Sequence, residues 1–502
     1  MLTKSELDEI QDYLSDASFV RGGNAANVVF PETAKEVASI LRDATNTRTP
    51  VTISGAGTGT VAGRVPFGGI VLATDKLNRI GDVVRVNDGG HVTAEAGVRL
   101  IDLQRAVDSQ NLIYPPDPTE RTCFIGGNIA TNASGARTFK YGATRKYVEA
   151  LKIVLATGDL ITLRRGELRA DDNGRINLEL PSGYVIETQL PSYQMPRVRK
   201  HASGYFVAPE MDVIDLFIGS EGTLSVIVEA EMKLLPKPEG LLSGVVFFDS
   251  EDSLISFVRE ARERSLGARG GNPNVRDGAG LDARALEYFD VESLHFLRAK
   301  YQSVPDEAVG AIFFEQETTP TTEESLMSNW LKLIEDHHAL ADQSWFATSE
   351  PDHAKLREFR HALPVLMNEW FGKYKQRKVS TDMSVPDDAF PEMLKFYRDA
   401  LKGGELRYTI FGHIGDNHVH VNILPRDDHE AARAWEIYRS FIRRAVDLGG
   451  TISAEHGIGK LKRDYLRELY GDEHLREMAA LKRAFDPAGI LGRGNMFGED
   501  FL

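Results

Sequence analysis

The sequence predicts an α+β protein built from more than one domain. Its 502 residues exceed the roughly 250–300 residues at which a single hydrophobic core stops growing. Hydrophobic residues make up 42% and charged residues 26% of the chain, the balance of a packed globular protein. Strand and helix patterns are mixed in the first half, without the regular alternation of a Rossmann fold.

Local signals place the elements of the first half. Thr33-Ala34-Lys35-Glu36 is a capping box, which predicts the start of a helix. Turn residues at 87–90 and 157–159 each separate two strand-like runs and so predict two hairpins. The predicted strands of this half cover residues 51–53, 83–86, 92–96, 151–156, 160–163 and 224–235.

The proline pair in Pro236-Lys237-Pro238 predicts a domain boundary. We therefore expect a first domain over 1–235 and a second α+β domain over 236–427. A helical segment over 428–502 is expected to pack back on the first domain. The predicted helices beyond the boundary cover 254–264, 323–337, 388–401, 433–448 and 465–485, with a strand over 311–314.

Charge and hydropathy exclude several classes of protein. A net charge of −15 argues against a nucleic-acid binder, which needs clustered Lys and Arg. No apolar stretch approaches the roughly 20 residues of a transmembrane helix. Residues 1–14 have an acidic amphipathic helix pattern without the features of a signal peptide. A cytoplasmic protein is the expectation.

The single cysteine, Cys123, limits the redox chemistry of the chain. One thiol allows neither an internal disulfide nor a cysteine-held iron–sulfur cluster or zinc site. Any electrons must therefore travel through an organic cofactor.

Two glycine-rich segments predict a site for a phosphate-bearing cofactor. Residues 54–60 (Ser-Gly-Ala-Gly-Thr-Gly-Thr) follow a short strand, and glycines there let backbone N–H groups approach a diphosphate. This loop alone is a weak signal, because it lacks the features of a Walker or Rossmann motif. A second segment, 115–135, adds three prolines (Pro115, Pro116 and Pro118) and further glycines and amides. A long surface loop without function would be uncommon.

The densest group of chemically active residues is Phe411–Asn422. On a strand from His418 onward, His418, His420 and Asn422 would share one face. A Gly-Asp-Asn turn could fold His413 toward that face, and Glu455 in Ser453–Gly459 offers a carboxylate. Converging imidazoles and a carboxylate suit Zn²⁺ or Mn²⁺. A polar strand face without a metal explains the pattern equally well from these residues alone.

Together the motifs resemble the FAD-linked oxidase family of the vanillyl-alcohol oxidase type. The resemblance is carried, in order, by 55–60, 115–118, 125–135, 140–142 and 217–224. The similar branch contains D-lactate dehydrogenases, the glycolate oxidase flavoprotein subunit and D-2-hydroxyglutarate dehydrogenases. It implies a two-part FAD-binding domain, an α+β substrate (cap) domain and a C-terminal helical segment carrying Glu455 and His456.

The resemblance implies a non-covalent FAD, since neither His nor Cys lies in the first loop. Gly55-Ala56-Gly57-Thr58 departs slightly from the family's Gly-Gly-Gly-Thr, and Cys123 is expected to be a packed core thiol. The implied FAD-binding residues are Ser54, Gly55, Ala56, Gly57, Thr58, Gly59, Thr60, Pro116, Asp117, Gly126, Gly127, Asn128, Thr131, Ser134, Gly135, Glu221, Gly222 and Ile227.

The resemblance also implies roles around the histidine cluster. His413, His420 and Glu455 would bind a divalent metal (Zn or Mn), and His456 would be the general base. Arg360 and Asn422 would bind the substrate, whose hydride passes to flavin N5. His418 departs from the family, which commonly has Asn there. Two roles for His418 stay open: it could donate a hydrogen bond to a neighbouring group, or it could be an extra metal ligand.

The implied reaction is metal-assisted oxidation of a small 2-hydroxy acid, with D-lactate or a similar D-2-hydroxy acid favoured. The 2-hydroxyglutarate group tends to have Lys where this chain has Ser380, although nearby Lys378 could substitute. The alternatives are a D-2-hydroxyglutarate or glycolate dehydrogenase, an FAD-dependent ether-lipid synthase-like enzyme and a non-enzymatic flavin- or metal-binding protein. Electrons would pass to a separate acceptor: a quinone, an electron-transfer flavoprotein, a cytochrome or an iron–sulfur subunit. Through such a partner the protein could lie at a membrane surface.

Overall fold

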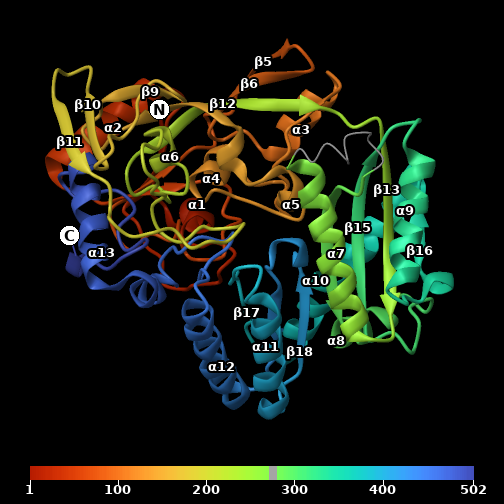
Figure 1. The fold of residues 1–502 in the computed structure, drawn as a ribbon. Helices are drawn as coiled ribbons and strands as arrows, with labels where there is room; N and C mark the ends of the chain where they lie inside the picture. The colour runs from red at the N-terminus through yellow and green to blue at the C-terminus, as the bar shows by residue number, and fades with distance from the viewer. Residues whose placement is uncertain (271–279, 502) are drawn as a thin grey trace.

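A computed structural model describes residues 1–270 and 280–501. In this part of the chain the strands form four β-sheets, and Figure 1 shows helices interspersed among them. The protein is therefore of the mixed α+β class that the sequence predicts.

The N-terminal half contains three of the sheets. The strands are β1 (Leu2–Lys4), β2 (Asn27–Phe30), β3 (Val51–Ser54), β4 (Ile70–Ala73), β5 (Ile80–Val86), β6 (Gly89–Glu95), β7 (Leu112–Ile113), β8 (Val148–Val154), β9 (Leu160–Arg164), β10 (Arg175–Glu179), β11 (Val185–Gln189) and β12 (Val226–Pro236). The helices are α1 (Leu7–Ile10), α2 (Ala34–Thr47), α3 (Leu100–Asp108), α4 (Ile125–Ala130), α5 (Thr138–Tyr141) and α6 (Ile214–Phe217).

These strands form one partly parallel sheet and two antiparallel sheets. The first sheet has the order β1-β2-β4-β3, with β4 parallel to β2 and β3. The largest has the order β5-β6-β12-β8-β9, with β7 beside β12, and β10 pairs with β11. Both predicted hairpins are confirmed, because β5 pairs with β6 and β8 with β9 in antiparallel register. Asn87 adopts a φ of 53° in the first turn, as its residue type permits.

A seven-stranded antiparallel sheet follows β12. Its strands are β13 (Gly240–Phe248), β14 (Ala283–Asp290), β15 (Gly310–Thr318), β16 (Trp345–Ala347), β17 (Val379–Ser380), β18 (Tyr408–Gly412) and β19 (His420–Ile423), in the order β16-β13-β15-β14-β18-β19-β17. The helices of this region are α7 (Glu251–Arg269), α8 (Val291–Arg298), α9 (Glu323–Asp336), α10 (Glu350–Tyr374) and α11 (Phe390–Gly404). The neighbouring strands β14, β18 and β19 carry or adjoin the residues of the histidine cluster.

The C-terminal region contains the helices α12 (Asp428–Asp447) and α13 (Arg463–Phe485), joined by an irregular segment. Helix α13 lies beside β11 in Figure 1. The Lys482 ammonium donates to the Thr223 carbonyl at 2.7 Å, and Leu491 forms a parallel bridge with Val51. The end of the chain thus packs on the N-terminal region.

The sequence signals locate most elements correctly. Thr33 caps α2 by accepting a hydrogen bond from the Glu36 amide at 3.2 Å. The Glu36 carboxylate reaches back to the Glu32 amide at 2.7 Å, so the capping box is closed one residue earlier than expected.

Two predictions are wrong about where an element begins. Residues 1–14 do not form one helix, because Leu2–Lys4 pairs with Val28–Phe30 as strand β1 and only a short helix follows. Strand β19 begins at His420 and not at His418. A one-turn 3-10 helix, Ile414–Asp416, precedes the strand and delays its start.

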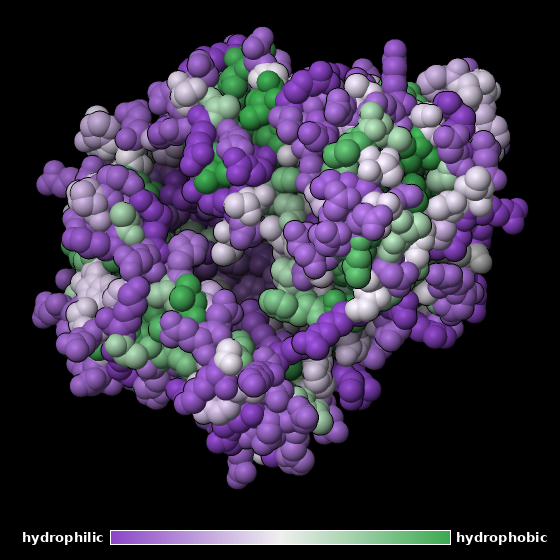
Figure 2. Space-filling view, turned by 180° about the vertical axis from the view of Figure 1, so that it is seen from behind, coloured by the Kyte–Doolittle hydropathy of each residue, from purple (hydrophilic) through white to green (hydrophobic). Residues whose placement is uncertain are grey.

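In the part of the chain that the structure describes, no helix is both long and apolar enough to cross a bilayer. The cytoplasmic location stays a prediction. In the space-filling view of Figure 2 one face is hollowed near its middle, and both hydrophilic and hydrophobic residues border the hollow.

Candidate active site

The first loop, the second glycine segment and the residues around Glu221 meet around one cavity. Most residues predicted to bind FAD line it: Gly55, Ala56, Gly57, Thr58, Gly59, Gly126, Gly127, Asn128, Thr131, Glu221, Gly222 and Ile227. His456 and Cys123 also line it. Burial raises the pKa of the Cys123 thiol to about 11, so this thiol is neutral and unreactive at ordinary pH.

The cavity fits a cofactor that is bound through backbone and amide groups. Asn128 Nδ2 and Ser225 Oγ line it, are buried, and have no hydrogen-bond partner in the structure. Buried polar atoms without a partner are costly, so a ligand that accepts and donates hydrogen bonds would stabilise them. Gly57 has a φ of +80°, and at Gly59 and Gly127 an added Cβ would meet nothing within 4 Å. Gly59 and Gly127 thus leave space beside the backbone.

Arg64 supplies a cation to this cavity that the sequence reasoning missed. Its guanidinium donates to the Ser54 hydroxyl at 3.0 Å and to the Gly55 carbonyl at 2.8 Å. Burial lowers the pKa of Arg64, but an arginine remains charged under all ordinary conditions. A permanent positive charge beside a glycine loop suits a diphosphate.

The remaining predicted FAD residues lie outside the lining of this cavity. Ser54 is buried beneath the loop, Thr60 is exposed, and Pro116 is buried. Asp117 lines a different cavity. Ser134 donates to Glu455 Oε2 at 3.3 Å, and the Gly135 carbonyl accepts from Lys200 at 2.9 Å. Ser134 and Gly135 therefore lie at the histidine cluster.

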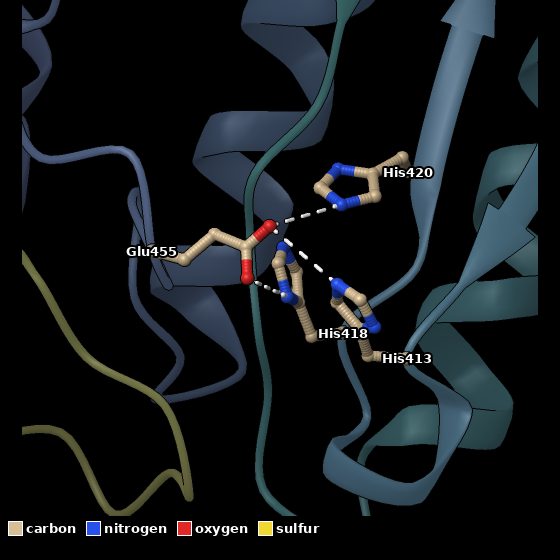
Figure 3. A group of neighbouring side chains, drawn as sticks. All are labelled: His413, His418, His420 and Glu455. Carbon is tan, nitrogen blue, oxygen red and sulfur yellow. Dashed lines mark ion pairs between the residues drawn. The ribbon is translucent and has the colours of Figure 1, made fainter. Parts of the chain in front are cut away.

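The histidine cluster converges on Glu455, as Figure 3 shows. Glu455 Oε1 lies 3.5 Å from His413 Nε2 and 3.4 Å from His420 Nε2. Glu455 Oε2 lies 3.9 Å from His418 Nδ1. One ligand atom from each of these four residues lies within 4.8 Å of the others. This donor set fits a divalent transition metal.

Acceptors outside the cluster orient two of the rings. His413 Nδ1 lies 2.7 Å from Glu287 Oε1, and His420 Nδ1 donates to the Thr381 carbonyl at 2.9 Å. Burial would lower the pKa of His413, but the Glu287 carboxylate raises it to about 8. Burial lowers the pKa of His418 to about 3. The Nε2 atoms of His413 and His420 are thereby left facing Glu455.

Lys200 places a buried positive charge on the same carboxylate. Its ammonium, with a fully buried side chain, lies 3.2 Å from Glu455 Oε2. Burial alone would raise the pKa of Glu455, but Lys200 and His413 hold it well below its usual range. Glu455 is therefore ionised and able to bind a cation.

Asp382 holds the segment that carries Glu455 and His456. Its carboxylate accepts from the backbone amides of Glu455 and His456 at 3.2 and 3.1 Å and from the Lys462 ammonium at 2.6 Å. Asp382 Oδ2 also lies 3.3 Å from His456 Nδ1. Burial would raise the pKa of Asp382, but His456 and Lys462 keep it well below its usual range.

Glu221 fixes the same segment from the cofactor side. Its carboxylate accepts from the Ile458 and Gly459 amides, both at 2.6 Å. Gly457 has a φ of +79°, and a Cβ there would lie 2.8 Å from Glu221 Oε1. The glycine therefore allows the close approach of this segment to Glu221, one of the residues predicted to bind FAD.

Arg360 lies in an ion pair and also borders a cavity. Its guanidinium Nε and Nη2 lie 3.2 and 3.0 Å from Glu287 Oε2. The cavity, about 540 Å³, lies between the N-terminal region and the seven-stranded sheet and is also lined by Arg137, Arg284 and Arg357. Asn422 is fully buried on β19, and its Oδ1 has no hydrogen-bond partner. Their roles toward a substrate stay predictions.

The sequence reasoning missed the residues that support the cluster. Glu287, Lys200 and Asp382 come from separate segments, and folding alone brings them to the histidines. Asp382 lies two residues beyond Ser380, and its only local signal is an acidic side chain shortly before Ser384-Val385-Pro386.

Comparison with known proteins agrees with this geometry. Residues 25–164 match the family described as "FAD binding domain", and residues 273–496 match "FAD linked oxidases, C-terminal domain". The solved structure of an alkyldihydroxyacetonephosphate synthase has a TM-score of 0.66 at 15% identity and covers 98% of this chain and 81% of its own. At that identity the likeness shows the fold alone.

Curated relatives align along nearly the whole chain. The glycolate oxidase subunit GlcD of Bacillus subtilis is 30% identical over 94% of this chain and 89% of its own length. A D-lactate dehydrogenase of Anaerostipes hadrus is 29% identical over 97% and 93%. A D-2-hydroxyglutarate dehydrogenase of Stutzerimonas stutzeri is 28% identical over 94% and 90%. The chain therefore belongs to the FAD-linked oxidase family that its motifs indicate.

Proposed function

We propose that this protein is an FAD-dependent dehydrogenase that oxidises a D-2-hydroxy acid, preferably D-lactate or a similar monocarboxylate, to the 2-oxo acid. One observation carries the proposal. Glu455 meets three imidazoles, while its neighbour His456 lines the glycine-rich cavity. A metal bound by Glu455 and a flavin in the cavity would therefore flank the same small volume.

His413, His420 and Glu455 would hold the ion, and the residues lining the glycine-rich cavity would hold FAD. When bound, the ion supplies positive charge that favours loss of the hydroxyl proton, and FAD supplies the acceptor for the hydride.

The proton then needs a base beside the substrate. His456 Nδ1 lies 3.3 Å from Asp382, which fixes the ring, and Nε2 lies 3.7 Å from Glu455 Oε1. Nε2 is therefore the atom that takes the hydroxyl proton. With a side chain 35% exposed, His456 can afterwards release the proton to water.

The carboxylate of the substrate needs a cation and a donor. Arg360 and Asn422 fulfil these roles in the proposal, because both adjoin the cluster through Glu287 and β19. Ser380 is neutral and favours a monocarboxylate over 2-hydroxyglutarate. The chain has one cysteine, so it holds no cluster of its own, and electrons leave to a separate acceptor such as a quinone, an electron-transfer flavoprotein, a cytochrome or an iron–sulfur subunit.

Anaerobic titration of the purified yellow protein tests this proposal. D-lactate should bleach the flavin, whereas L-lactate is the matched control and should not. Bleaching by D-2-hydroxyglutarate or glycolate in place of D-lactate would correct the substrate within the same reaction class. A yellow protein that no 2-hydroxy acid bleaches would contradict the proposal.

A further inference from the structure

We propose that His418 is a third imidazole ligand, so that the metal site of this chain is three histidines and one glutamate. The inference rests on the metal site of the proposed function and goes beyond it, since the family resemblance supplies only His413, His420 and Glu455. It concerns the composition of the site and can be tested without substrate.

The first argument is that all three rings are arranged alike. In each ring one nitrogen lies near an oxygen outside the cluster. This oxygen belongs to Glu287 for His413, at 2.7 Å, and to Thr381 for His420, at 2.9 Å. For His418 it belongs to Asp382, at 3.1 Å. The other nitrogen of each ring faces Glu455, at 3.5, 3.4 and 3.9 Å. Metal-bound histidines almost always have this arrangement, with an outer acceptor fixing the ring.

The second argument is that His418 lacks a partner without a metal. Its side chain is fully buried, and neither ring nitrogen makes a hydrogen bond in the structure. Nε2 has a carboxylate oxygen of Asp382 3.1 Å away, whereas the oxygen that Nδ1 faces, Glu455 Oε2, lies 3.9 Å away. A buried polar atom without a partner destabilises the fold. A metal ion bound to Nδ1 would remove this cost.

The ligand atoms also lie close to the spacing that a single ion needs. Two ligands of one zinc ion lie at most about 4.2 Å apart, twice the bond length of about 2.1 Å. The four ligand atoms here lie within 4.8 Å of one another, so small side-chain movements close the set. Lys200 contacts Glu455 Oε2, which leaves Oε1 for the ion.

A set with three imidazoles should alter the choice of metal. Nitrogen ligands favour Zn²⁺ over Mn²⁺, whereas Mn²⁺ prefers oxygen ligands. His418→Asn introduces the residue that the family commonly has there, and it should shift the preference back toward Mn²⁺.

X-ray absorption spectroscopy of the zinc-loaded, FAD-containing protein tests the inference directly. We expect three imidazoles around zinc in the natural chain and two in His418→Asn. The dissociation constant for zinc, measured by competition with a chelator, should rise by about tenfold or more in that variant. His201→Asn is the matched control, because His201 is partly buried and bonded to Thr451 at 2.9 Å but lies outside the set. It should keep three imidazoles and the same affinity.

Two imidazoles in the natural chain, no bound zinc, or equal zinc affinity in His418→Asn would overturn the assignment. The count in the natural chain needs no variant, so misfolding of His418→Asn cannot hide the result. Bleaching of the flavin by D-lactate is scored separately. A bleaching enzyme with a two-imidazole site would refute this inference while leaving the proposed function intact.

Discussion

Gly57 lies at the point of the first loop where the backbone needs a conformation that side chains disfavour. Its φ is +80°, and an added Cβ would lie 2.3 Å from Arg64 Nη2. Gly57→Val should therefore distort the loop, displace Arg64 and purify without FAD. Flavin absorbance relative to protein measures this. Gly183→Val is the control, since Gly183 has a φ of +82° with nothing within 4 Å and lies outside the cavity lining. A full complement of FAD in Gly57→Val would mean that the diphosphate binds elsewhere.

Enzyme kinetics can show whether Arg360 or its neighbour Arg357 binds the substrate carboxylate. Arg360→Lys keeps the charge but loses the planar fork, so the KM for D-lactate should rise about tenfold or more. Arg357→Lys is the matched control on the same helix, since Arg357 lines the same cavity but pairs with Glu350 at 2.5 Å. If only Arg357→Lys raises the KM, Arg357 and not Arg360 binds the substrate carboxylate. If neither variant changes the kinetics, neither arginine binds it.

At the scale of elements, the irregular segment between α12 and α13 is the most important for the candidate active site. It carries Glu455 and His456, and it is held by the Asp382 and Glu221 carboxylates. The position of these two residues thus depends on contacts with parts of the chain more than 70 residues away.

Asp382→Asn should weaken this segment. The change leaves the Lys462 ammonium, 2.6 Å from Asp382 and mostly buried, without its counter-charge, and breaking a buried pair costs about 3–5 kcal/mol. The midpoint of urea unfolding should fall clearly. Asp399→Asn is the control, because Asp399 and its partner Lys395 are 59% and 76% exposed and a surface pair contributes only about 0–1 kcal/mol. Equal midpoints for the two variants would show that Asp382 does not hold the segment.

The same segment shows what the sequence can and cannot predict. Periodicity and capping residues locate α2, both hairpins and β12, because those signals are local. The strand expected from His418 begins at His420, since alternation cannot reveal the preceding helical turn. Glu287, Asp382 and Lys200 reach the cluster only through sheet order and packing, which no local pattern contains. His413, His420 and Glu455 could be named because motifs mark them.

At the scale of the whole molecule, the candidate active site lies where three regions meet. The N-terminal region supplies the glycine cavity, the seven-stranded sheet supplies the histidines, and the C-terminal region supplies Glu455 and His456. Binding of FAD and binding of metal should therefore be separable, although both are needed for the reaction.

Stopped-flow reduction of the flavin by D-lactate, with metal analysis of Glu455→Ala and His456→Ala, tests this account most directly. His456→Ala should keep metal and FAD but reduce its flavin at least about a hundredfold more slowly, since a general base contributes about 10²–10⁴ in rate. Glu455→Ala should keep FAD but bind the metal far more weakly, because the set loses its carboxylate. Loss of the ion from His456→Ala together with its retention in Glu455→Ala would reverse the assignment. Normal metal content and normal reduction in both variants would contradict the site itself.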